Sequence, residues 1–420
     1  MKAYSTKASR EQEQAMRSVV PNGMYSQQRD YSRPLYFQRE EGSRVWDLDG
    51  NEYLDLHMKF GAVLLGHHPP RLTRRLQEEI PRLVSDRSVL GVSVGERLKK
   101  MIPGFERMQF GLSGSEMVMH AIRLARRYTG RRVVLRFAEN YHGMADGMWE
   151  KTNEQTAAHG VYILPWNDEA ALDGYLERHA DEVAAILTEP VCVNGGGIEP
   201  APGFLPGLRQ RCDRIGAVLI FDQIVTGLRL APDGGQRLYG VKPDLCLCGK
   251  CLTNGLTPLT VLMGSDELMW LYEEGSVVYA GTYNGYALGL QAALLTLEEY
   301  ERDADMLHPA MCARTREMHR CLDDACKRAG LPLVIQGPEV CASFHQSSRR
   351  IARGSELTGQ VVRGNMALRE CMRRYGILSA PMSRLYPSFA LCDADVEFFA
   401  ERIRPAVADA AALLGSRHRR

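Results

Sequence analysis

The sequence carries no excess of charge and no long hydrophobic run, and these two absences exclude several functions. Its 420 residues include 52 Lys and Arg against 51 Asp and Glu, so the formal net charge is +1. So balanced a chain lacks the basic surface expected of a protein that binds nucleic acid or an anionic membrane. No apolar run reaches membrane-spanning length, so no transmembrane helix is predicted.

The chain also lacks a signal-peptide pattern, internal repeats and low-complexity linkers. Residues 1–18 are polar and charged, without the apolar core of a secretory signal. We therefore expect a cytoplasmic protein whose 11 cysteines remain reduced thiols. Cys246, Cys248 and Cys251 stand close together, but their spacing is not that of a zinc ribbon or knuckle. No second ligand pair follows them, so no metal site is predicted.

What the sequence does contain, from about residue 60 to residue 300, is an alternation of short apolar runs and helical patterns. Several runs are continuous stretches of Val, Ile and Leu, as expected of strands covered on both faces. Strands separated by helices indicate βαβ units, so the predicted fold class is α/β with a mostly parallel central sheet. The predicted strands are 108–112, 133–137, 161–165, 184–189, 217–222, 245–248 and 260–263.

The pattern differs near both ends of the chain. Residues 45–56 read as a β-hairpin whose turn is Asp49-Gly50. After about residue 310, helices and short strands alternate as in a separate α+β lobe, which the hairpin is expected to join. The predicted elements there are helices 311–329, 361–375 and 393–414 and strands 333–335 and 342–345. The predicted domains are an N-terminal segment joining the small lobe (1–58), a large domain (59–310) and a C-terminal small domain (311–420).

Two residues at strand ends are the first candidates for chemistry, because ligands of parallel sheets bind at the carboxyl ends of the strands. Asp222 ends the apolar run AVLIFD, where an acid is costly unless paired. It could keep a pyridine nitrogen protonated, or it could only cap a helix or form an ion pair. Lys250 closes the run DLCLCGK. A desolvated lysine there could act as a nucleophile, although a surface lysine is the commoner outcome.

Three loops add to this pattern. The stretch SGSE (113–116) has the spacing of a capping box, and its free N–H groups could receive a phosphate. The stretch YHG (141–143) offers an aromatic ring that could stack on a flat cofactor. The small-residue stretch AGT (280–282) could reach a phosphate. In isolation, each loop is better explained by an ordinary feature: a helix cap, a loop tyrosine and a turn, respectively. Their order along the chain is the informative feature.

A set of longer motifs carries a family resemblance through most of the chain. They are PNGMYSQQR (21–29), LLGHHPP (64–70), SGSEMVMHAIRLAR (113–126), YHGMADG (141–147), TEPV (188–191), FLPGLRQRCDRIGAVLIFDQIVTGLR (204–229), GVKPDLCLCGK (240–250) and AGTYNG (280–285). Through them the chain resembles the class III aminotransferases, which depend on pyridoxal 5′-phosphate (PLP) and have fold type I. Within that family it is most similar to the glutamate-1-semialdehyde 2,1-aminomutases.

The resemblance implies a catalytic role for Lys250, which would form the Schiff base with PLP and then move the substrate proton. Asp222 would pair with the pyridine nitrogen, and Tyr141 would stack on the ring. Glu189 and His142 would lie beside the cofactor without a more definite role.

The resemblance also implies where the phosphate of PLP would bind. Ser113, Gly114 and Ser115 would hold it at the start of the helix. Thr282 would add a contact from the partner subunit, which implies an obligate homodimer with its sites at the interface.

Departures from the aminomutase pattern concern the substrate. The usual Asp-Glu pair is here Asp222-Gln223. The stretch of the substrate wall that is normally aromatic and small reads Met58-Lys59-Phe60, so Lys59 and Phe60 are candidate substrate contacts. For Lys59, an exposed loop lysine is the competing interpretation.

Two further positions bear on the substrate. Arg29 aligns with the aminomutase arginine that receives a substrate carboxylate. The glutamate expected in the C-terminal lobe is absent from the corresponding stretch APMSRLY (380–386). These departures predict a substrate other than glutamate 1-semialdehyde.

An aminomutase-like frame with an altered pocket resembles the aminotransferases of aminoglycoside antibiotic biosynthesis. That likeness implies ping-pong transfer of an amino group, with glutamate as donor, to an oxo or aldehyde carbon of an amino sugar. Lys250 would be the acid and base of both half-reactions. An aminomutase, or an epimerase using a Tyr, a Cys or Lys59 as a second acid, remains open. A non-catalytic binding protein is disfavoured by the intact set of Lys250, Asp222 and Tyr141.

Overall fold

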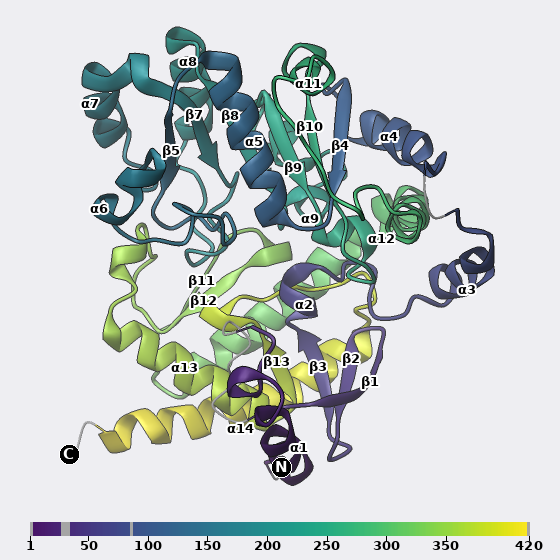
Figure 1. The fold of residues 1–420 in the computed structure, drawn as a ribbon. Helices are drawn as coiled ribbons and strands as arrows, with labels where there is room; N and C mark the ends of the chain where they lie inside the picture. Colours follow the sequence, from purple (N-terminus) through teal and green to yellow (C-terminus); the bar gives the residue numbers. More distant parts are fainter. Residues whose placement is uncertain (1–2, 27–33, 85–86, 418–420) are drawn as a thin grey trace. The chain divides into compact units, whose positions relative to one another are not determined.

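The computed structural model describes residues 3–26, 34–84 and 87–417 (Figure 1). Contacts divide the chain into two compact units, treated separately below. The unit called here the central unit contains residues 71–304 and 352–356, and the terminal unit contains residues 1–70, 305–351 and 357–420. The chain passes between units at 70/71 and 304/305, where the predicted boundaries are 58/59 and 310/311, and it crosses twice more, at 351/352 and 356/357. No helix among the described residues is both long and apolar enough to cross a membrane.

The central unit is built on a seven-stranded sheet in the order β4-β10-β9-β8-β7-β5-β6 (Figure 1). The pairs from β9 to β6 are parallel, whereas β10 runs antiparallel to both β4 and β9. The prediction of a mostly parallel α/β sheet is therefore confirmed, and each predicted strand is present. The strands are β4 (Arg107–Gly111), β5 (Val133–Phe137), β6 (Val161–Leu164), β7 (Val183–Thr188), β8 (Val218–Gln223), β9 (Leu245–Cys248) and β10 (Thr260–Gly264).

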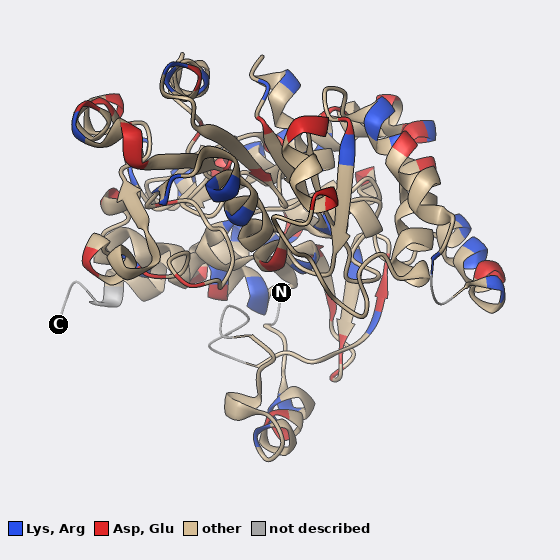
Figure 2. Ribbon diagram, turned by 45° about the horizontal axis from the view of Figure 1, so that its top comes forward, with Lys and Arg blue, Asp and Glu red and all other residues tan. Residues whose placement is uncertain are grey.

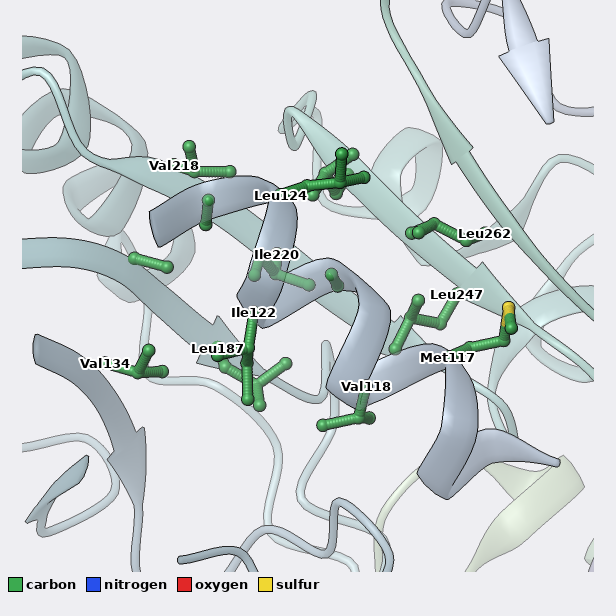
Figure 3. Packing of buried hydrophobic residues seen from close by; sticks show 14 of the residues in the cluster. Met117, Val118, Ile122, Leu124, Val134, Leu187, Val218, Ile220, Leu247 and Leu262 are labelled. Atoms are coloured by element: carbon green, nitrogen blue, oxygen red, sulfur yellow. The ribbon is translucent and has the colours of Figure 1, made fainter. Parts of the chain in front are cut away.

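Helix α5 (Gly114–Thr129) covers one face of this sheet with a buried apolar stripe. Met117, Val118, Ile122 and Leu124 pack onto strand residues, and the strand side of the cluster consists of Val134, Leu187, Val218, Ile220, Leu247 and Leu262 (Figure 3). The buried series 117, 121, 124 and 118, 122, 125 each have spacings of four and three residues, which place these helix side chains on one face. The remaining helices of the described central unit are α3 (Pro70–Glu79), α4 (Leu90–Met101), α6 (Asn153–Thr156), α7 (Glu169–His179), α8 (Phe204–Ile215), α9 (Gly227–Leu230), α10 (Gly234–Leu238) and α11 (Asp266–Glu273).

One helix is much longer than predicted. The helix expected at 311–329 is the second part of α12 (Ala287–Arg328), which belongs to the central unit up to Ala304 and to the terminal unit from Asp305. The helix continues through Pro309, a residue that normally interrupts helices because it lacks the N–H donor. Lys and Arg as well as Asp and Glu are scattered over the helices (Figure 2), in keeping with the balanced net charge.

The terminal unit contains a four-stranded sheet in the order β1-β2-β3-β13. The hairpin predicted at 45–56 is confirmed as the antiparallel pair of β2 and β3, and β13 pairs in parallel with β3. The hairpin thus joins the C-terminal part of the chain, as expected. The elements are α1 (Lys7–Arg17), β1 (Phe37–Glu41), β2 (Arg44–Asp47), β3 (Glu52–Leu56), α2 (Met58–Gly61), β11 (Val334–Gln336), β12 (Ser343–His345), α13 (Gly359–Arg374), β13 (Ile377–Ser379) and α14 (Asp393–Arg417).

Candidate active site

Three neighbouring strands of the central sheet end in ionisable residues. Strands β7, β8 and β9 are adjacent and parallel, so their carboxyl ends meet at one edge of the sheet. Glu189 directly follows β7, Asp222 is the penultimate residue of β8, and Lys250 follows β9 after one glycine. Lys250 and Asp222 both influence the electrostatic environment of Glu189, so the three groups form one cluster.

Asp222 is a buried carboxylate held by a histidine. Its Oδ2 lies 2.9 Å from Nδ1 of His142, and its Oδ1 accepts a hydrogen bond from the backbone N–H of Ile224 at 3.1 Å. The carboxylate and the imidazole ring are both buried, and Nε2 of His142 has no hydrogen-bond partner among the residues that the structure describes. A carboxylate that a histidine holds in position on one side can form an ion pair with a cation on its other side.

The neighbouring Gln223 points to the opposite face of the sheet, as the alternation of a strand requires. Its amide nitrogen donates to Oε1 of Gln236 at 2.6 Å, and its oxygen accepts from the backbone N–H of Gly235 at 2.6 Å. The departure from the usual Asp-Glu pair therefore changes a buried polar contact on the far face of β8. It does not alter the partners of Asp222.

Glu189 is buried beside Asp222. Burial is the largest effect on its carboxyl group, and with the neighbouring charge of Asp222 it raises the pKa of Glu189 to about 8. Oε1 accepts hydrogen bonds from the backbone N–H of Tyr141 at 2.8 Å and from Nδ2 of Asn194 at 3.2 Å. At neutral pH the carboxyl group of Glu189 is therefore mostly protonated.

The loop after β5 brings Tyr141 and His142 to the same edge. Oδ1 of Asn140 accepts from the backbone N–H of Glu189 at 2.8 Å and from Oγ1 of Thr188 at 3.0 Å, which ties this loop to the end of β7. The Tyr141 ring is partly buried and meets Trp149 edge-on, with centroids 6.3 Å apart. Asn140 and Asn194 were not predicted as site residues, because an asparagine beside a Gly-rich loop reads as an ordinary turn residue.

The start of α5 is packed against that loop. Oγ of Ser113 accepts from the backbone N–H of Glu116 at 3.2 Å, which confirms the N-cap. The reciprocal bond of a capping box is displaced by one residue, because Glu116 accepts from the backbone N–H of Leu112 at 2.7 Å. Oγ of Ser115 accepts from the backbone N–H of Met144 at 3.0 Å.

Two glycines allow this close approach. Gly143 has a φ of +88°, and a Cβ there would lie 2.2 Å from Oγ of Ser115. A Cβ on Gly114 would meet Cγ1 of Ile224 at 3.1 Å. The predicted phosphate loop, the loop of Tyr141 and the end of β8 are therefore in direct contact.

Lys250 begins a short 3₁₀ turn (Lys250–Thr253) with a φ of +44°, in the left-handed region that non-glycine residues rarely adopt. A Cβ on the preceding Gly249 would lie 2.7 Å from Cγ2 of Thr260 and 3.1 Å from Cδ1 of Ile224. Ile224 thus contacts both the lysine loop and the helix start. Backbone strain of this kind is typical of functional sites.

Thr282 stands apart from this cluster within the described chain. It lies in an exposed segment together with Val278, Tyr279 and Tyr283. Its contact with the phosphate of a partner subunit therefore stays a prediction. Exposed apolar side chains gathered around it are what an interface between subunits would use.

The substrate residues predicted from the sequence lie in the terminal unit. Met58, Lys59 and Phe60 have φ values of +44°, +52° and +58° and form a left-handed turn, which costs roughly 1–2 kcal/mol per residue. The Lys59 ammonium lies 3.1 Å from Oε1 of Glu40. The Phe60 ring packs edge-on against His57 and lies 5.9 Å from the guanidinium of Arg384. Arg29 lies outside the described residues.

The stretch that lacks the expected glutamate is also in the terminal unit. Ser383, Arg384 and Leu385 are buried there, and Nε of Arg384 donates to the carbonyl of Pro381 at 2.9 Å. Met382 and Ser383 have positive φ values, so this stretch is strained like residues 58–60. The charged group of this stretch that lies near Phe60 is the guanidinium of Arg384.

Comparison with known proteins agrees with this geometry. The family model for class III aminotransferases matches residues 25–330. A glutamate-1-semialdehyde 2,1-aminomutase of Pelotomaculum thermopropionicum is 35% identical over 345 residues, which cover 77% of each chain. An omega-transaminase from Sphaerobacter thermophilus superposes with a TM-score of 0.89 at 25% identity, over 96% of this chain and 98% of that one. A glutamate-1-semialdehyde aminomutase of Pseudomonas aeruginosa PAO1, solved in complex with PMP, has a TM-score of 0.86 at 24% identity, over 96% and 94%.

Proposed function

The chain belongs to the class III aminotransferases, PLP-dependent enzymes of fold type I, and from this premise we propose that it transfers an amino group to an amino sugar. The donor is an amino acid, glutamate, and the acceptor is an oxo or aldehyde carbon of the sugar, as in aminoglycoside antibiotic biosynthesis. The observation that carries this proposal is a complete reaction cluster around Lys250 combined with substrate segments that depart from those of the aminomutases.

The residues of the central unit fit PLP. Asp222, backed by His142, is an acceptor for the protonated pyridine nitrogen. The start of α5 offers backbone N–H groups to a phosphate, with Ser113, Gly114 and Ser115 in place. Nε2 of His142 is buried without a partner, a need that a ligand or a water molecule would meet.

The chemistry of the reaction divides between the cofactor and the chain. PLP, when bound, supplies an electron sink that lets an amino-bearing carbon lose a proton. The Lys250 amine takes up that proton and returns it to a different atom, as general base and then general acid. Asp222 would pair with the protonated ring nitrogen, and the His142 contact holds the carboxylate in position. Glu189 is mostly protonated at neutral pH, so it adds no second negative charge beside Asp222.

The substrate segments support a substrate other than that of the aminomutases. Arg384 stands in the stretch where those enzymes carry a glutamate, and a guanidinium is suited to the carboxylates of an amino-acid donor. Lys59 replaces a small residue and forms an ion pair with Glu40. Glutamate-1-semialdehyde aminomutase activity is the second candidate, and the 35% identity to such an enzyme favours it.

The proposal includes a cytoplasmic homodimer. The support for the dimer is the exposed segment that holds Val278, Tyr279 and Tyr283 around Thr282. In this arrangement Thr282 of one subunit reaches the phosphate of the other.

The test is an absorbance spectrum of the purified holoenzyme. An aminoglycoside that carries a primary amine on an exocyclic carbon is added, followed by an oxo acid. The proposal predicts that the amino sugar bleaches the visible band of the cofactor, and that the oxo acid restores it. Bleaching by small amino acids together with rapid turnover of glutamate 1-semialdehyde, and no response to amino sugars, would establish the aminomutase instead.

A further inference from the structure

The terminal unit contains a cavity of about 360 Å³ beside strands β1 and β3. Its size lies at the lower end of the range for small-molecule sites. The wall combines aromatic and ionisable side chains, among them Tyr36, Phe37, Glu40, Asp55, Lys59 and His67. Aromatic faces next to a carboxylate are a combination that binds organic cations.

Glu40 is the fixed anion of this cavity. Its Oε2 lies 3.3 Å from Nδ1 of His67, and Nε2 of the same ring lies 2.9 Å from Oδ2 of the buried Asp55. Burial opposes the charge of His67, but the hydrogen bonds to Asp55 and Glu40 outweigh it and raise the pKa of His67 to about 9. The hydrogen bond from His67 lowers the pKa of Glu40 to about 2. Glu40 is therefore ionised and anchored through one oxygen.

The second oxygen of Glu40 has an exchangeable partner. Oε1 lies 3.1 Å from the ammonium of Lys59, whose side chain is 45% exposed, and 3.2 Å from Nε2 of His68, which is 49% exposed. Ion pairs with exposed partners contribute little to stability. With Asp55 balanced by His67, the charge of Glu40 is balanced by Lys59. A ligand ammonium that takes the place of Lys59 would leave the charge of the cavity unchanged.

We propose that this cavity of the terminal unit binds an ammonium group of an amino sugar and that Glu40 is the residue that selects for it. Lys59 occupies the position of the ligand ammonium in the free protein and moves into solvent when the acceptor binds. Tyr36 and Phe37 offer apolar faces to the sugar ring. This inference rests on the proposed function and adds to it the requirement for a cationic acceptor.

The test compares Glu40→Gln with the matched control Glu41→Gln. Glu41 lies next in the same strand and pairs only with the exposed Arg39 among the described residues. The ligands are a pseudodisaccharide aminoglycoside and its analogue with one amine replaced by hydroxyl, titrated by calorimetry into the holoenzyme. We expect the wild type and Glu41→Gln to bind the parent on the order of tenfold more tightly than one of its singly deaminated analogues, the loss typical of a charged hydrogen bond. Glu40→Gln should bind both ligands equally.

A second variant keeps the test decisive if Glu40→Gln folds poorly. Lys59→Met removes the competing ammonium and should tighten binding of the parent severalfold without affecting binding of the deaminated analogue. Equal affinities of wild type, Glu40→Gln and Lys59→Met for the parent would overturn the inference while leaving the proposed function intact. If the wild type neither binds nor converts any amino sugar, the proposed function fails and the inference fails with it.

Discussion

The two units contain the same three groups, two carboxyl groups and one buried histidine, and arrange them in opposite ways. In the central unit His142 contacts only Asp222 of the pair, and Glu189 keeps its proton because its pKa is about 8. In the terminal unit His67 bridges Asp55 and Glu40, and the pKa of His67 rises to about 9 while that of Glu40 falls to about 2. His142 therefore contacts one carboxyl group, whereas His67 contacts two.

This difference matches the roles that we propose for the two clusters. The cluster of the central unit is the reaction centre, and that of the terminal unit is the binding centre. The central cluster lies at the carboxyl ends of parallel strands, the edge of the sheet where ligands bind in this fold. The terminal cluster pairs its carboxylates with its own cations, and Lys59 and His68 are the exposed partners of Glu40 among the described residues. Strain marks both regions, at Lys250 in the first and at Met58–Phe60 in the second.

The largest effect is expected from Lys250→Ala. Removal of the amine that moves the substrate proton should lower turnover by at least about a thousandfold, because no other group supplies general acid and base catalysis at that position. Steady-state assays of both half-reactions measure it. The control is Lys242→Ala, an exposed lysine before the same strand, which should leave turnover unchanged. Loss of less than tenfold in Lys250→Ala would remove the lysine from its proposed role.

The next effect is expected from Asp222→Asn. The amide keeps the shape of the carboxylate but cannot hold a proton on the ring nitrogen, so turnover should fall by about a hundredfold to a thousandfold. Single-turnover kinetics with saturating donor separate this loss from weaker cofactor binding. The exposed Asp213→Asn, at a carboxylate paired with Arg209, is the matched control. Unchanged kinetics in Asp222→Asn would show that His142 alone can fix the electronics of the site.

In the terminal unit the main effect should be on stability. His67→Asn leaves the fully buried Asp55 without its cation and should lower the free energy of unfolding by about 3–5 kcal/mol. His68→Asn removes an exposed partner of Glu40 and should change the free energy of unfolding by less than about 0.5 kcal/mol. The His67 contribution is present below its ordinary pKa of 6.5 and is lost as the pH rises through about 9. Urea unfolding at a series of pH values measures both features.

The last prediction concerns the pH dependence of stability set by Glu189, which leaves turnover aside. The folded protein retains this proton up to about pH 8, whereas the unfolded chain releases it near pH 4.5. Stability should therefore fall as the pH rises between these values, by at most roughly 5 kcal/mol, before it levels off. In cofactor-free protein, Glu189→Gln should remove that slope, and the exposed Glu177→Gln should retain it. Parallel pH profiles for wild type and Glu189→Gln would contradict the assignment.

The reaction centre was more predictable from the sequence than the binding centre. Glu189, Asp222 and Lys250 each follow or end an apolar run, and parallel strands bring their carboxyl ends together, so local pattern was sufficient. The antiparallel direction of β10 was not predictable, because an apolar run carries no sign of its direction. The continuation of α12 through Pro309 was missed for a related reason, since tertiary packing overrides a local helix breaker.

The binding centre depends on conformations and contacts that local pattern does not encode. Met58, Lys59 and Phe60 have no preference for positive φ, so their left-handed turn follows only from the surrounding structure. Glu40 reads as an ordinary polar residue of an edge strand, and its contact with His67 joins residues far apart in sequence. The pairing of Glu189 with Asn194 was likewise invisible, because it depends on how the Gly-rich loop folds back.

The most direct test of the account is to locate the lysine to which the cofactor is attached. Borohydride reduction of the holoenzyme converts that linkage into a stable secondary amine, and peptide mass mapping then identifies the modified residue. We predict a single phosphopyridoxyl adduct on Lys250 and none in Lys250→Ala. An adduct on another lysine, or no adduct in a cofactor-saturated protein, would contradict the assignment of Lys250 as the centre of the site.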